Sequence, residues 1–310
     1  MGKNTPLSLV KYTTAAVGIS VLKNKKMRWS APHAFADPFE NSAYTPMGFD
    51  KLDLTKTAVR SIAAMIFARN DPLGEANAIK KAVRRWRAED RFHSEDEAVE
   101  ALSELLPTMI AQRFVEIEDY FKSWVRYAYN VRVLCLCDGF DDMSSWETYG
   151  DQHRGLAIRF KVGDGNSVDR PHRIAYRSQR NVVTTLREQV AIFVGEQIPD
   201  EDEKLENKLL VKSKQLASQR EWRSVWLPKN LLDPGNADMS VSYEDRPFTV
   251  GEVTAVYLGV SISEADREKV LSLLAKDYPK AKVYQAEVKE AEYVLGFSKA
   301  GGSVVKELTL

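Results

Sequence analysis

The hydrophobic pattern is most informative between Val133 and Lys161. A compact apolar run over 133–137 predicts a buried strand, because it is short, begins with a β-branched residue and ends at turn-forming aspartates and a glycine. Apolar residues at helical spacing over 143–150 predict a short helix, and alternation over 156–161 predicts a half-buried strand. Aromatic and ionisable side chains therefore gather near strand ends, where ligands are commonly bound.

The two ends of the chain predict further strands. Near the start, the pattern predicts a strand over 7–12, a helix over 17–25, an extended segment over 27–30 and an ordered, proline-containing loop over 31–40. Near the end, the pattern predicts strands over 253–258, 282–286 and 293–297, with a helix over 263–277 after the first of them.

Residues 53–130 have a different character. Their apolar positions recur at helical spacing, and Ser94 with Glu97 forms a capping box, so this block predicts several helices. The later part of the chain predicts a brief strand over 173–176, helices over 180–197 and 201–215, a strand over 220–227 and a loop over 228–247. We therefore predict a single α+β domain over 1–310, with a mixed, mostly antiparallel sheet and a helical insertion at 53–130.

Charge and cysteine content limit the class of protein. The 44 Lys and Arg residues balance the 44 Asp and Glu residues, which argues against a protein that mainly coats nucleic acid. Cys135 and Cys137 share one face of a predicted strand, but about 6.6 Å of strand rise separates them, which is beyond disulfide reach. Two free thiols, together with the lack of a membrane-length apolar run or a signal peptide, predict a cytoplasmic protein with no membrane partner.

Metal chemistry has little support in the sequence. None of the four histidines is paired with a cysteine at zinc spacing, so no metal is expected. A weak site for a hard cation at Asp138, Asp141 and Asp142 remains an alternative. The sequence also has no P-loop, no G-x-G-x-x-G, no G-x-S-x-G and no H-E-x-x-H, which leaves ATPase, Rossmann dehydrogenase, α/β-hydrolase and zinc protease unsupported.

The segment around Glu221 is the sharpest polar cluster. Gln219 and Glu221 lie two residues apart at the start of a predicted strand, so their side chains share a face. A carboxylate beside an amide suits a site that binds a sugar hydroxyl and stabilises a developing positive charge. The alternative is a solvated strand edge on which Glu221 pairs with a neighbouring arginine.

Three other groups of residues have a functional and a structural interpretation. Trp146 and Tyr149 can sandwich a planar ring such as nicotinamide or adenine, or they can pack in the core. His153 can contact a phosphate or act as a base, or it can be a surface residue. The basic run over 80–87 can bind nucleic acid, but neighbouring acidic residues favour a solvated helix face.

Several segments, taken in order, carry a family resemblance. The matching residues are Lys11 and Tyr12, then Trp29, Ser30, Pro32, Phe35, Asp37, Pro38 and Phe39, then Trp146, Tyr149, His153 and Gly155, then Lys212 or Lys214 with Gln219, Glu221, Trp222 and Arg223, and finally Leu258 and Gly259. In this the chain resembles a bacterial family of uncharacterised proteins, the domain of unknown function 2971. It departs from the family pattern at Thr13, Ala36, Glu40, Cys135 to Cys137, and Gln219.

The layout also resembles, by structural analogy, the ADP-ribosyltransferase architecture. This resemblance implies an enzyme that consumes NAD as its substrate and transfers to a protein or nucleic-acid acceptor. A toxin or phage-defence role is implied by the kind of bacterial family that the chain resembles. It implies that Glu221 is the catalytic carboxylate and Gln219 its helper. The residues that it assigns to the dinucleotide are Lys11, Tyr12, Trp29, Ser30, Trp146, Tyr149, His153 and Arg223.

Two other classes of function remain open. The chain can be a catalytically silent module whose aromatic pocket binds a nucleotide or a protein. It can also be a nucleic-acid-processing effector, which requires the basic helix around Arg84 to contact phosphate.

Overall fold

The computed structural model describes residues 5–40, 47–72, 77–179, 182–196, 207–227 and 241–300. The chain divides into two compact units, each assembled from separate segments. Unit 1 comprises Met1–Phe35, Asn130–Arg180 and Leu210–Leu310, and unit 2 comprises Ala36–Tyr129 and Asn181–Leu209. None of the described helices is long and apolar enough to cross a membrane.

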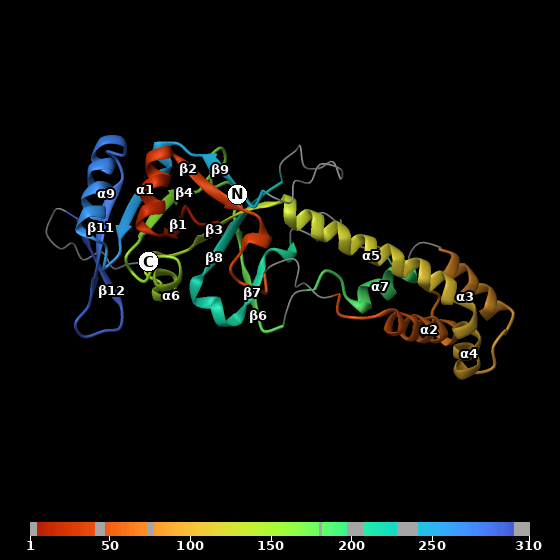
Figure 1. Cartoon of the computed structure of the whole chain (residues 1–310). Helices are drawn as coiled ribbons and strands as arrows, with labels where there is room; N and C mark the ends of the chain where they lie inside the picture. The colour runs from red at the N-terminus through yellow and green to blue at the C-terminus, as the bar shows by residue number, and fades with distance from the viewer. Residues whose placement is uncertain are drawn as a thin grey trace. The chain divides into compact units, whose positions relative to one another are not determined.

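Unit 1 is built on a mixed, mostly antiparallel sheet, as the sequence predicts (Figure 1). Its ten strands are β1 (Ser8–Thr13), β2 (Lys26–Ser30), β3 (Arg132–Cys137), β4 (Leu156–Lys161), β5 (His172–Arg173), β8 (Glu221–Trp226), β9 (Tyr243–Pro247), β10 (Val253–Leu258), β11 (Lys282–Val288) and β12 (Leu295–Lys299). The main path runs β12-β11-β10-β4-β1-β3-β2-β9, and β8 pairs with β3 and β5. Only the β10–β11 pairing within this sheet is parallel. The chain is therefore an α+β protein.

Strand β3 has three partners, and this arrangement positions the site. Along one edge it pairs with β8 over six residue pairs, ending at Cys137 opposite Glu221. It also pairs with β1 through Val10 and Cys137, and with β2 at its opposite end through Ser30 and Val133. The start of β8 therefore lies at the same end of β3 as β1.

The two faces of the sheet have separate cores. Helices α1 (Ala15–Asn24) and α9 (Glu264–Asp277) cover one face, where Leu22, Val270 and Leu274 pack against alternate strand residues (Figure 1). The opposite face carries a smaller core, to which α6 (Met143–Thr148) contributes Trp146. Alternation along each strand thus decides which core a side chain joins.

Unit 2 contains the helices predicted over 53–130. They are α2 (Lys51–Phe67), α3 (Ala78–Ala88), α4 (Glu95–Leu105) and α5 (Pro107–Asn130), the last of which ends at the boundary with unit 1. The predicted Ser94 cap is confirmed, because its hydroxyl accepts a hydrogen bond from the backbone N–H of Glu97. The sequence did not predict that a distant helix, α7 (Leu186–Phe193), belongs to the same unit, with Val190 in the shared core.

Three predictions for the second half of the chain are corrected. The predicted loop over 228–247 includes strand β9, which pairs with the edge of β2; its residues 228–240 lie outside the described part. The predicted helix over 201–215 is wrong at β7 (Val211–Ser213), which pairs in parallel with β6 (Ala175–Arg177), while 201–206 lie outside the described part. The brief strand over 173–176 is two short strands, β5 and β6. In each case long-range pairing outweighs local preference.

The remaining short elements are 3₁₀ turns. They are η1 (Pro32–Ala34) in the predicted proline-containing loop, η3 (Lys214–Gln219) before β8 and η5 (Val250–Glu252) before β10. Of these, η3 matters most for the site, because it leads directly into β8.

Candidate functional site

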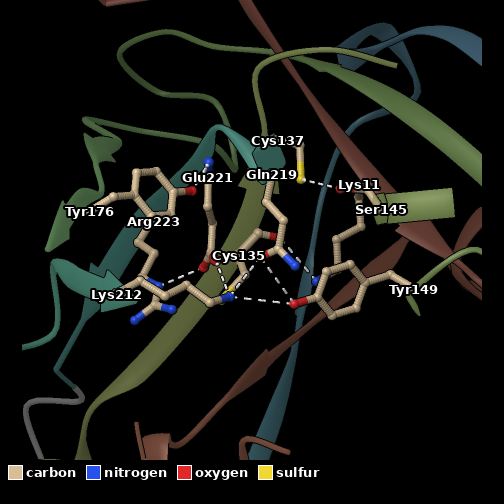
Figure 2. A network of polar contacts seen from close by, with 10 residues as sticks. All are labelled: Lys11, Cys135, Cys137, Ser145, Tyr149, Tyr176, Lys212, Gln219, Glu221 and Arg223. Carbon is tan, nitrogen blue, oxygen red and sulfur yellow. Dashed lines mark hydrogen bonds and ion pairs between the residues drawn. The ribbon is translucent and has the colours of Figure 1, made fainter. Parts of the chain in front are cut away.

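Lys212 is the centre of a buried polar network in unit 1 (Figure 2). Its Nζ donates a hydrogen bond to Glu221 Oε2 at 2.8 Å and to Gln219 Oε1 at 2.9 Å. The hydroxyl of Tyr149 lies 3.4 Å from the same Nζ. Gln219 and Glu221, which the sequence places on one face, therefore meet through a lysine that comes from β7.

Glu221 is an ionised carboxylate held between two cations. Its second oxygen, Oε1, accepts a hydrogen bond from Arg223 Nε at 2.7 Å, and the Glu221 residue is only 4% exposed. Burial by itself raises the pKa of this carboxyl, but the charges of Arg223 and Lys212 and their hydrogen bonds outweigh burial and lower the pKa to about 2. The negative charge is therefore present at any physiological pH.

The backbone around Arg220 brings the two acceptors together. Arg220 has φ +46°, a left-handed conformation that ends the turn η3 and starts β8. Glu221 is then fixed by its pairing with Cys137 and by its backbone N–H, which donates to the Tyr176 hydroxyl at 2.7 Å. Gln219, immediately before the turn, is 2% exposed.

Cations from three strands meet in this network. Lys11 reaches it from β1, and its Nζ donates to the carbonyl oxygen of Cys135 at 3.0 Å (Figure 2). Lys212 from β7 and Arg223 from β8 both pair with Glu221. Clustered cations favour an anionic ligand group.

Tyr149 connects the network to solvent. The residue follows α6 and is 41% exposed, while its hydroxyl points toward Lys212 and lies 3.5 Å from Gln219 Oε1. Burial raises the pKa of its phenol and the charge of Lys212 lowers it, with a net upward shift. The ring is therefore a neutral, partly accessible aromatic surface beside the buried charges.

The depressed pKa of Glu221 predicts an acid-sensitive contribution to stability. A carboxyl whose folded pKa lies below its unfolded value of 4.5 stabilises the fold above pH 4.5 and loses that contribution as the pH falls toward about 2. We expect the urea midpoint of the wild type to fall more steeply over this range than that of Glu221→Gln. Urea titrations at several pH values measure this, and parallel curves for the two proteins would contradict it.

The other aromatic candidates lie in the core. Trp146 is fully buried; its ring packs edge-on against Tyr12 at 5.2 Å, and its Nε1 donates to the Phe140 carbonyl. Tyr12 is 5% exposed and Trp29 is 3% exposed. Trp146 and Tyr149 therefore do not form a sandwich, and for Trp146 the core interpretation holds.

Ser30 and Trp29 do not join the network. Ser30 pairs with Val133, whereas Glu221 pairs with Cys137 four residues further along β3. That separation is about 14 Å of strand. A ligand that contacts both ends must span about 14 Å.

His153 lies in a separate place. Its ring stacks on Trp146 with centroids 6.3 Å apart, and its Nε2 is 3.7 Å from Glu147 Oε2. It lines an open hollow of about 570 Å³ bordered by Met143 and the β11–β12 hairpin, rather than the network around Lys212.

Several cations of the basic helix α3 have partners within unit 2. Arg84 pairs with Asp71 at 2.8 Å, Arg85 with Glu89 at 3.8 Å, and Lys80 Nζ is buried and donates to the Gly195 carbonyl at 2.9 Å. These contacts support the interpretation of α3 as an ordinary helix face.

The aspartates near α6 also have structural partners. Asp142 caps α6 through the backbone N–H of Ser145, and Asp141 pairs with Arg220 at 2.6 Å. Among the described residues no group of three or more His, Cys, Asp or Glu is arranged to hold a metal ion, and Cys135 and Cys137 are both free thiols.

Sequence patterns left two members of the network unassigned or ambiguous. Tyr176 was not foreseen, and the family resemblance offered Lys212 or Lys214 without deciding between them. The structure selects Lys212, because Lys214 is exposed.

No family model, curated protein or solved structure matches the chain. The family resemblance therefore stays a prediction.

Proposed function

We propose that the chain is an NAD-consuming enzyme of the ADP-ribosyltransferase kind, with its reaction centre at the Lys212 network. The observation that supports this most directly is the state of Glu221. It is ionised, it stands at the start of a strand beside Gln219, and a partly exposed aromatic ring lies next to it. A fixed negative charge in a water-poor site stabilises a developing positive charge better than the same group in water.

The chemistry that this arrangement suits is cleavage of a glycosidic bond. The bond between the ribose carbon and the nicotinamide nitrogen breaks, and nicotinamide leaves with the electron pair. The ribose carbon becomes positively charged, Glu221 stabilises it, and an acceptor hydroxyl, amine or water completes the reaction and loses a proton. Gln219 contributes an amide that can bind a ribose hydroxyl.

The cluster of cations supports a diphosphate-bearing substrate. Lys11 is half-buried and, within the described part of the chain, donates one side-chain hydrogen bond, to the Cys135 carbonyl, so an ammonium with three donors has capacity for a further acceptor. A phosphate oxygen is such an acceptor. The face of Tyr149 gives a surface on which nicotinamide or adenine can stack.

The test is nicotinamide release from NAD by the purified protein, with cell extract as a source of acceptors. We expect release by the wild type and a 10²–10³-fold loss in Glu221→Gln, about the cost of removing one transition-state stabiliser. Because Glu221→Gln also removes a buried charge, Lys11→Gln is the second variant, expected to raise KM. The control is Lys23→Gln, an exposed lysine on α1.

No release from any folded sample, with extract present, overturns the proposal. Circular dichroism and thermal melting establish which samples are folded.

A second candidate, a silent nucleotide-binding module, rests on a different observation. Both oxygens of Glu221 already accept hydrogen bonds from Lys212 and Arg223, as in a structural ion cluster. In that case the protein binds NAD or a related nucleotide without consuming it. Binding by calorimetry with no nicotinamide release distinguishes this candidate from the first.

A further inference from the structure

A second positively charged region lies on the sheet, apart from the Lys212 network. Pairing registers place Arg159 beside Ala255, Ala255 beside Lys282, and Lys299 beside Tyr284. Lys161 follows Arg159 by two residues and so points to the same face. We call the four cations Arg159, Lys161, Lys282 and Lys299 the basic face.

Strands β1, β4, β10, β11 and β12 carry no compensating negative charge on the side of the basic face. None of its four cations forms an ion pair within the described part of the chain. The other described residues of these five strands that point the same way are uncharged: Ser8, Val10, Tyr12, Ala157, Ala255, Tyr257, Tyr284, Ala286, Val288, Leu295 and Phe297. Further along the same face, Glu221 and Asp245 are each paired with an arginine. In a chain whose formal net charge is zero, this is a strong local concentration of positive charge.

The spacing of the basic face suits an extended polyanion. One strand, β10, lies between Lys282 and Arg159, so two strand spacings, about 10 Å, separate them, and Arg159 and Lys161 are about 7 Å apart along β4. The cations thus extend across the sheet from β12 and β11 to β4 rather than surrounding one point. The three lysines are exposed, and helices α1 and α9 lie on the other face of the sheet (Figure 1).

Aromatic rings accompany these cations. The guanidinium of Arg159 lies 4.9 Å from the centroid of Phe140 and 5.1 Å from that of Tyr257. Tyr284, which is half-buried, stands between Lys282 and Lys299 on the same face. Cations interleaved with aromatic rings are the combination that binds single-stranded nucleic acid, whose phosphates pair with cations and whose bases stack on flat groups. An acidic polypeptide uses the cations but gains much less from the rings.

We propose that the basic face binds single-stranded nucleic acid. We expect the interaction to be sequence-tolerant, because contacts to phosphates and stacking on rings do not select among bases. It does not depend on the Lys212 network or on NAD chemistry, and it does not use the basic helix α3.

The experiment measures binding of a fluorescein-labelled, mixed-sequence single-stranded RNA to the full chain by anisotropy at several salt concentrations. The test variant carries Lys161→Gln, Lys282→Gln and Lys299→Gln. The matched control carries Lys23→Gln, Lys276→Gln and Lys280→Gln, three exposed lysines on or just after α1 and α9. All six positions are exposed, so both variants are expected to fold, and melting curves check this.

We expect the test variant to bind at least 10-fold more weakly at low salt, and the slope of log affinity against log salt to fall by about 2, since each single-strand phosphate contact contributes about 0.7. The control variant keeps the wild-type slope. Absence of RNA binding, or equal losses in the two variants, overturns the proposal. Equally tight binding of poly-glutamate or of anionic vesicles shows attraction by charge alone and also overturns it.

Discussion

Replacing Glu221 with Gln is expected to lower the free energy of unfolding by about 3–5 kcal/mol. The substitution keeps the shape of the side chain but removes the carboxylate that contacts Lys212 Nζ at 2.8 Å and Arg223 Nε at 2.7 Å. Both buried cations then lose this counter-charge, and Arg223 is only 2% exposed. Urea denaturation at neutral pH measures the loss.

A double variant separates charge balance from lost packing. Adding Lys212→Met to Glu221→Gln removes one cation along with the anion, so we expect the combined cost to be smaller than the sum of the two single costs. The control is Asp245→Asn, which breaks the exposed ion pair with Arg28 and should cost no more than about 1 kcal/mol. If Glu221→Gln costs no more than this control, the network is not a coupled ion cluster.

Gly155→Ala is expected to cost about 3 kcal/mol or more. A Cβ at this position would lie 2.1 Å from the carbonyl oxygen of Thr13 and 2.8 Å from that of Gly150. Both atoms are backbone, one at the end of β1 and the other between α6 and β4, so no side chain can rotate to relieve the overlap. Thermal melting of the purified variant measures the loss of stability.

The matched control is Gly251→Ala, where a Cβ meets nothing within 4 Å. This residue lies in the 3₁₀ turn before β10, so alanine there should change stability by less than about 0.5 kcal/mol. If Gly155→Ala melted at the same temperature as Gly251→Ala, the backbone around Gly155 would be able to shift and accept a Cβ without loss of stability.

The local pattern of the sequence was enough to find two of the strands that build the site. Alternation located β4, and a compact apolar run located β3. Each of these signals repeats over several residues, so it survives in the folded chain. Gln219 and Glu221 do meet, but Gln219 lies in η3 rather than in the strand, and the left-handed turn at Arg220 brings the two side chains together.

The sequence pattern failed for strands that are short or rich in charged residues. Strand β7 has three residues and was predicted as helix, so the position of Lys212 could not be derived from the pattern. Strand β9 contains three charged residues and a proline, and it is a strand only because the edge of β2 pairs with it. For Trp146, spacing alone could not tell a buried ring from a ligand-facing one, because both lie on the apolar side of a short helix.

The order of the strands in the sheet also has a consequence for synthesis. Strand β1 leaves the ribosome first, but its partners β3 and β4 begin about 120 and 140 residues later. At 5–20 residues per second, β1 waits for roughly 6–25 s before it can pair with β3. During that time the first segment of unit 2 emerges, and its helices can begin to form from local contacts. The nascent chain therefore carries an unpaired apolar strand while it is being translated, which makes it a natural client for chaperones that bind such segments.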